Sequence, residues 1–363
     1  MEASRKENVI FWADFDKIQN NEFEYNIENR KALGASIKKA RRSIEKKSCY
    51  ICNLDKKICN SHSVPKFCLS NIAIDGEVYL SSKLINISDY QHNKGIKSTG
   101  TFHLICEKCD SSLFQTYENV ENFKKDITQK MLCEIAIKNY VHCIDKRYFE
   151  IASYEELLTR TDSSIISYSF MKMKLELSQI DLKNYHEQFK IAKKWYDSCD
   201  NTAYRLICNI ALPYTVPIAF QGNIALICDL EDKIINYVFD KNIIPKDIHI
   251  CVFPLKNETQ ILLFCKSADK SYRNFTKQFC KLDEDKQLEV INYIIFLYTE
   301  DYYISKNVQS DLFVNTNLLK VSRTNSDYVS FDKNAKPIND ALIRFSLKNR
   351  SKIPNLLCEK INT

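Results

Sequence analysis

The sequence predicts an α+β protein with an N-terminal zinc module, a helical middle and a C-terminal antiparallel sheet that carries helices. Three observations lead to this fold class. Two Cys-x2-Cys pairs lie in the first third of the chain, apolar residues then recur at helical spacing, and short apolar runs bounded by turn residues follow. These changes of pattern divide the chain into four expected parts, which are residues 1–47, 48–119, 120–200 and 201–363.

Length and composition restrict the class of protein. The chain has 363 residues, and its 45% hydrophobic content is enough for more than one core. Lys and Arg total 52 against 46 Asp and Glu, and this mild net charge of +6 permits nucleic-acid binding without requiring it. Met1–Asn8 leads into no apolar signal segment, and no window reaches the about 20 apolar residues of a membrane span. We therefore expect a cytoplasmic protein with no membrane partner, and most of its 15 cysteines reduced.

The first part is a polar arm that ends in a basic helix. Residues 1–34 are polar apart from the apolar island Val9–Trp12, and residues 35–47 have the pattern of a helix. The basic residues of this helix directly precede the first cysteine pair. They are either a solvated helix face or an arm that contacts phosphates. These residues are Lys38, Lys39, Arg41, Arg42, Lys46 and Lys47.

The remaining elements follow from periodicity and turn residues. Inside the zinc module we expect a helix at Val64–Ile72, a strand at Glu77–Leu80, a loop at 87–98, a strand at Thr101–Ile105 and a helix at 107–116. The middle predicts helices at 120–145, 150–160 and 165–197. The last part predicts strands at Tyr204–Cys208, Ile224–Cys228, Ile248–Phe253 and Thr259–Phe264, then helices at 269–281 and 284–299.

Two cysteine pairs predict a structural zinc site. Cys49 and Cys52 form the first pair, and Cys106 and Cys109 form the second, 53 residues later. Four thiolates from two tight turns complete a tetrahedral Zn²⁺ site with no open position. A competing set consists of Cys49, Cys52, Cys59 and His62, which would make the histidine a ligand and leave the second pair without a role.

The module resembles a known family. Cys-x2-Cys, then Ser61-His62-x-x-Pro65, then a strand and a second Cys-x2-Cys at the head of a helix is similar to the zinc-braced treble-clef branch of the HNH endonucleases. The resemblance covers residues 48–119. The segment Phe102–Asp110, with Phe114 and Tyr117–Asn119 beyond it, also resembles uncharacterised bacterial proteins that carry such a module.

The resemblance implies a nuclease site. It implies that His62 is the general base that activates water and that Asp110 is a ligand of a catalytic Mg²⁺ or Mn²⁺. Ser61 stands where the family often has an acidic residue, and Thr101 where it often has an asparagine. The implied function is a metal-dependent nuclease acting on DNA or RNA, in the manner of a phage-defence effector. The alternative is a non-catalytic zinc-stabilised protein that binds nucleic acid or another protein.

Other candidate residues are weaker. Glu118 follows Asp110 by eight residues, and on one helix the two would lie roughly 12 Å apart, too far to chelate one ion. The histidines His92 and His103 are alternatives to His62. The C-terminal part lacks a glycine-rich phosphate loop, since Gly222 is its one glycine, and it remains a candidate surface for a protein partner.

Overall fold

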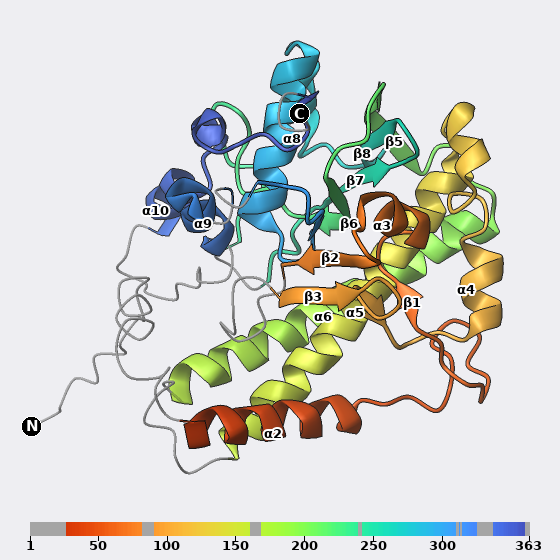
Figure 1. Cartoon of the computed structure of the whole chain (residues 1–363), viewed down its shortest axis with the longest axis vertical. Helices are drawn as coiled ribbons and strands as arrows, with labels where there is room; N and C mark the ends of the chain where they lie inside the picture. The colour runs from red at the N-terminus through yellow and green to blue at the C-terminus, as the bar shows by residue number, and fades with distance from the viewer. Residues whose placement is uncertain are drawn as a thin grey trace, which may run out of the picture.

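The computed structural model describes residues 27–81, 91–159, 168–238, 242–309, 312, 314–324 and 337–359 (Figure 1). Its helices are α2 (Ile27–Ser43), α3 (Lys66–Ile72), α4 (Glu107–Leu113), α5 (Gln129–Leu158), α6 (Tyr168–Asp197), α7 (Arg273–Phe279), α8 (Glu284–Tyr298), α9 (Thr316–Arg323) and α10 (Pro337–Arg344). Its strands are β1 (Ser61–His62), β2 (Glu77–Leu80), β3 (Gln91–Gly95), β4 (Thr101–Phe102), β5 (Tyr204–Leu212), β6 (Ile218–Ile224), β7 (Ile248–Pro254), β8 (Thr259–Lys266) and β9 (Tyr303–Ile304). The predicted island Val9–Trp12 lies outside the described residues.

An antiparallel sheet forms the centre of the described molecule. Its seven strands run in the order β3-β2-β9-β6-β7-β8-β5, and the β1–β4 pair forms a separate small sheet. The short strand β9 joins the N-terminal strand β2 to the C-terminal strand β6, because Tyr303 pairs with Leu80 on one side and with Ala219 on the other. The mixed helix-and-sheet class and the antiparallel C-terminal sheet are therefore confirmed.

Alternation along the strands sends side chains to two separate cores. Ile250 and Val252 of β7 belong to a core with α8, whereas Cys251 and Phe253 belong to a core with α5. Because successive side chains of a strand point to opposite faces, this sheet is buried on both sides. Figure 1 shows α8 on the side of the sheet away from α5 and α6.

The α5 helix is the internal support of the fold. Thr128 caps its N-terminus by accepting a hydrogen bond from the backbone N–H of Met131, and residues 131–141 are all buried. The helix runs unbroken to Leu158, so the expected break between residues 145 and 150 is wrong. Charged residues can lie within this partly buried helix because they form ion pairs. Lys146, for example, contacts Asp301 at 2.5 Å. Figure 1 shows α6 beside α5, and α2 packs against α5.

Two strand expectations also need correction. The strand expected at Ile224–Cys228 is misplaced. The observed strand β6 occupies Ile218–Ile224, so it ends at the residue where the expected strand begins. The polar centre of β6 resembles a turn in sequence, yet Gln221 is buried in the sheet and donates a hydrogen bond to Asn139. Strand β3 lies inside the stretch 87–98 that was expected to be a loop. Among the described helices, none combines the length and hydropathy that a membrane span requires.

Candidate metal centre

Four cysteine thiols from two distant segments converge at one point. The sulfur atoms of Cys49, Cys52, Cys106 and Cys109 all lie within 4.8 Å of one another. The Sγ atoms of Cys52 and Cys106 are 4.0 Å apart, and all four cysteines are free thiols. The predicted four-cysteine cluster is thus present, and it is a group that could hold a metal ion.

Each cysteine pair is shaped by its own backbone. In the first turn, the N–H of Cys49 donates to the carbonyl of Leu54 and the N–H of Asn53 donates back to the carbonyl of Cys49. Asn53 has a φ of 55°, a left-handed conformation that asparagine tolerates better than most residues. The second pair opens α4, because Cys106 is the residue before the helix and its carbonyl accepts from the N–H of Asp110.

Backbone pairing brings the two turns together. The N–H of Tyr50 donates to Leu104 at 2.9 Å, and the N–H of Cys59 donates to Ile105 at 2.9 Å. These bonds hold the segment after the first turn against the segment before the second. As a result, the N–H of Cys106 also donates to the Sγ of Cys49 at 3.3 Å, a contact that stabilises a thiolate.

The donor set fits zinc. Zn–S bonds of about 2.3 Å in a tetrahedron place sulfurs about 3.8 Å apart, close to the separation of Cys52 and Cys106. Burial raises the pKa of the Cys106 thiol, but hydrogen bonds involving Cys109 and the other two thiols outweigh it and lower the pKa to about 7. Bound zinc would take all four positions and add folding free energy rather than open a site for catalysis.

The competing ligand set is not assembled in the described structure. The Cys59 thiol donates to the carbonyl of Ile105 at 3.2 Å, and burial raises its pKa to about 11. His62 also turns away, because its Nε2 is hydrogen-bonded to the carbonyl of Ile96 at 2.8 Å. Neither residue belongs to the metal-ligand group found among the described residues.

His62 is a half-buried, neutral imidazole. It sits in β1 directly opposite Thr101 of β4, and its Nε2 must carry the proton that the Ile96 carbonyl accepts. Its Nδ1 is therefore left with a lone pair. Burial lowers the pKa of His62, and the nearby positive charge of Lys138 acts in the same direction.

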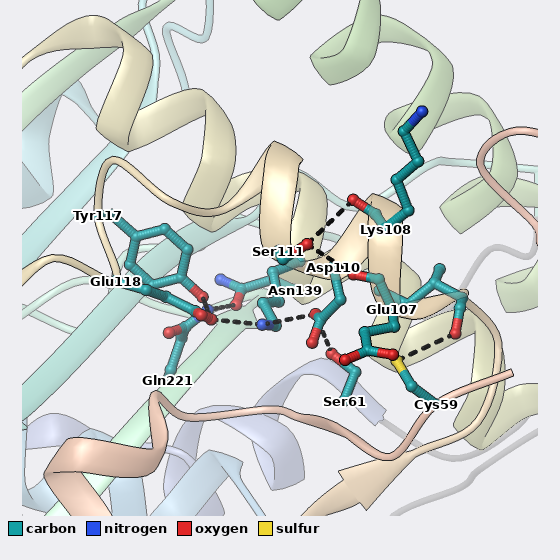
Figure 2. A network of polar contacts seen from close by, with 12 residues as sticks. Cys59, Ser61, Glu107, Lys108, Asp110, Ser111, Tyr117, Glu118, Asn139 and Gln221 are labelled. Atoms are coloured by element: carbon teal, nitrogen blue, oxygen red, sulfur yellow. Dashed lines mark hydrogen bonds and ion pairs between the residues drawn. The ribbon is translucent and has the colours of Figure 1, made fainter.

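Asp110 lies at the centre of a polar cluster (Figure 2). Its Oδ1 accepts a hydrogen bond from the Ser61 hydroxyl at 2.6 Å and lies 3.2 Å from the Nζ of Lys138. The same ammonium contacts Oε1 of Glu118 and lies 4.3 Å from the centre of the Phe114 ring. Glu118 lies beyond the end of α4, so the separation of roughly 12 Å along a shared helix does not apply, and Lys138 contacts both carboxylates.

His62 and Asp110 bond to different groups, although they lie close enough for the Asp110 charge to act on the pKa of His62, raising it against the effect of burial. Ser61 and His62 are neighbours in β1, and successive side chains of a strand point to opposite faces. Ser61 faces Asp110, whereas His62 faces Ile96. Of the two histidines considered as alternatives to His62, His103 is exposed and its backbone N–H donates to Asp145, and the side chain of His92 lies outside the described part.

Sequence reasoning missed Lys138. This lysine is 1% exposed and comes from the first half of α5, in a stretch whose apolar periodicity predicts a helix but no polar site. The signal was present, since a charged residue stands between Ile137 and Val141, in a stretch of mostly apolar residues. A lysine in such a position requires partners, because an unpaired buried ammonium is costly.

The cluster continues into the C-terminal sheet. The Tyr117 hydroxyl donates to Glu118 at 3.3 Å and accepts from Gln221 at 3.5 Å (Figure 2). Gln221 also donates to Asn139, whose side-chain amide donates to the Nδ1 of His249 at 3.0 Å. A chain of buried and partly buried polar groups therefore runs from the segment with the four cysteines through α5 to β6 and β7.

Comparisons with known proteins leave the family open. A four-cysteine cluster is shared by many kinds of zinc site and does not by itself identify an HNH family. No family model, no curated protein and no solved structure matches this chain.

Proposed function

We propose that this chain is a zinc-stabilised protein that binds nucleic acid through a basic surface adjoining its HNH-like module, without cleaving it. The observation that carries the proposal is the contact between Asp110 and Lys138. A catalytic cation would depend on the Asp110 carboxylate, and that carboxylate already accepts from Ser61 and pairs with a buried ammonium. The fixed positive charge of Lys138 repels a second cation at this position, so a catalytic Mg²⁺ or Mn²⁺ fits poorly here.

The basic end of α2 supports binding to nucleic acid. Ala40 and Ser36 face the interior, so Lys38 and Arg42, each two residues away from Ala40, project to the opposite side of the helix. Both side chains are exposed, as is Lys47 just before the first cysteine pair. Exposed cations on one helix face, in the helix that precedes the first cysteine pair along the chain, are suited to contacts with phosphates.

The second candidate is a metal-dependent nuclease, acting as a defence effector against foreign DNA by analogy with the family that the module resembles. One observation favours it. The bond from Nε2 of His62 to Ile96 leaves Nδ1 as a free base, and the lowered pKa of His62 keeps the ring neutral near pH 7. That is the protonation state required of a general base.

One experiment separates the two functions. Labelled single-stranded DNA, duplex DNA and RNA are incubated with the protein in Mg²⁺, Mn²⁺ or EDTA, and binding and integrity are both recorded. Binding with intact nucleic acid in every metal supports the first proposal. Cleavage that requires metal and disappears in His62→Ala overturns it in favour of the nuclease, and an absence of both binding and cleavage overturns both functions.

A charge-reversal pair locates the binding surface. Lys38→Glu with Arg42→Glu reverses two outward charges one helical turn apart on α2. Arg273→Glu with Lys277→Glu makes the same change on α7, where both residues are exposed and also four positions apart. We expect the α2 pair to weaken binding at least tenfold at low salt and the α7 pair to leave it within about twofold.

A further inference from the structure

The first cysteine turn rests on a small aromatic cluster contributed by three segments. Tyr50 comes from the turn, Tyr148 from α5 and His186 from α6. The Tyr50 hydroxyl is 2.6 Å from Nδ1 of His186, and the Tyr148 hydroxyl is 3.4 Å from Nε2. Both ring nitrogens are therefore engaged by hydroxyl groups, which fixes the orientation of the imidazole.

The rings are held at defined angles and remain partly accessible. Tyr50 and His186 are nearly stacked, with centroids 5.6 Å apart and an interplanar angle of 29°. Tyr148 meets His186 edge-on, with centroids 5.9 Å apart. All three side chains are half-buried rather than sealed in the core. Fixed aromatic rings with an accessible face are suited to stacking because little conformational entropy is lost on binding.

Two lysines lie beside this cluster. The Nζ of Lys46 lies 4.2 Å from the centre of the Tyr148 ring, and Lys46 is exposed. Lys190 is exposed and lies one helical turn from His186. Its Nζ forms an ion pair with Oε1 of Glu187 at 2.8 Å. Burial, with the added positive charge of Lys190 and Lys46, lowers the pKa of His186, so the ring is neutral near pH 7.

We infer that Tyr148 and His186, with Lys46 beside them, form a stacking site for an unpaired base of a single-stranded nucleic acid. This inference rests on the proposed nucleic-acid-binding function and specifies its ligand. An aromatic face not covered by another group binds any exposed base, and the Lys46 ammonium, which lies over one face of the Tyr148 ring, binds the adjoining phosphate. A base in a duplex is already stacked and cannot use the site. The outward charges of α2 lie next along the chain from Lys46 and continue the path for the backbone.

The test compares a dT oligonucleotide and an equally long duplex, each carrying one 2-aminopurine, at several salt concentrations. For the wild-type protein we expect tighter binding of the single strand and a change in 2-aminopurine fluorescence on stacking. Tyr148→Leu should weaken single-strand binding about tenfold and leave duplex binding unchanged. Tyr148→Phe keeps the ring and should stay within about twofold of wild type.

A second variant keeps the test decisive if Tyr148→Leu is poorly folded. Lys46→Gln alters only an exposed side chain, and it should reduce the salt dependence of single-strand binding by about one counterion. Equal affinities for single strand and duplex, without a fluorescence change, overturn this inference and leave the proposed function standing. A protein that binds neither nucleic acid overturns the proposed function itself.

Discussion

The Nζ of Lys138 lies 3.2 Å from Oδ1 of Asp110, and the lysine side chain is 1% exposed. The two residues come from different elements, α5 and α4, and a third residue, Glu118, gives the ammonium a second carboxylate partner. Their pairing ties the zinc module to the long internal helix. It also places a permanent positive charge beside the carboxylate that a catalytic cation would need.

Replacing Lys138 tests how much its contacts with the two carboxylates contribute to stability. Lys138→Met leaves Asp110 and Glu118 near each other without a counter-charge, and we expect the free energy of unfolding to fall by about 3 kcal/mol at pH 7. Mn²⁺ should restore part of the loss in the variant, because two carboxylates and the Ser61 hydroxyl then offer oxygen ligands. Urea unfolding with and without Mn²⁺ measures both effects.

The control for this prediction is Lys124→Met. Lys124 pairs with Glu121 on the surface, with side chains 60% and 68% exposed, so its loss should cost under about 1 kcal/mol. Equal effects of the two substitutions would mean that the Lys138 contacts contribute nothing special. Stabilisation of the wild-type protein by Mn²⁺, abolished in Asp110→Asn, would show that the carboxylate binds a cation despite Lys138.

Protonation of His249 should make stability fall in acid. Burial lowers the pKa of this histidine to about 4, below the about 6.5 of an unfolded chain. Between these values the unfolded chain binds the proton and the folded one does not, so stability present above pH 6.5 is lost as the pH falls towards 4. From pH 7 to pH 5 the contribution is about 2 kcal/mol.

Comparison with variants isolates this contribution. His249→Gln should flatten the pH dependence of unfolding between pH 7 and 5, whereas His103→Gln, a change at an exposed histidine, should leave it as in wild type. Urea unfolding at half-unit pH steps gives the curves. Parallel curves for wild type and His249→Gln would show that this buried histidine is not the group responsible.

Gly100 should not tolerate a side chain. Its φ is +65°, and a Cβ built there would lie 1.9 Å from the hydroxyl oxygen of Tyr303. That tyrosine is bonded to Ser63, next to His62, so the clash falls where the zinc module meets the sheet. We expect Gly100→Ala to lower the free energy of unfolding by about 3 kcal/mol.

Gly34 provides the matched glycine substitution. It lies within α2, where an added Cβ meets nothing within 4 Å. Gly34→Ala should therefore stabilise the protein by up to about 1 kcal/mol, through helix propensity alone. If Gly100→Ala unfolds at the same urea concentration as the wild-type protein, then the Tyr303 side chain moves aside at little cost in free energy, and the prediction is wrong.

The parts of the fold that the sequence predicts are those governed by local patterns. The spacing of Cys49, Cys52, Cys106 and Cys109 predicts their convergence, and the apolar runs predict β7 and β8 to within a few residues. Continuous apolar runs identify strands that are covered on both faces, because no polar side chain has to be accommodated.

The parts that it does not predict depend on pairing between distant residues. In the sequence, the polar residue Gln221 makes β6 resemble a turn. In the structure, the Gln221 side chain donates a hydrogen bond to Asn139, which lies 82 positions away. In the sequence, the charged residue Lys146 makes α5 look interrupted. In the structure, Lys146 forms an ion pair with Asp301, which lies 155 positions away. Lys138 alters the reading of Asp110 for the same reason, since local sequence shows a charge but not its partner.

The most direct test of the account is the metal content of the purified protein. If the two cysteine turns share one closed site, elemental analysis should find about one zinc per chain. Cys106→Ser should lose that zinc and unfold more readily, while Cys59→Ser, which changes a nearby thiol bonded only to the Ile105 carbonyl, should keep it. A stably folded protein without metal, or equal zinc loss in both variants, would contradict the account.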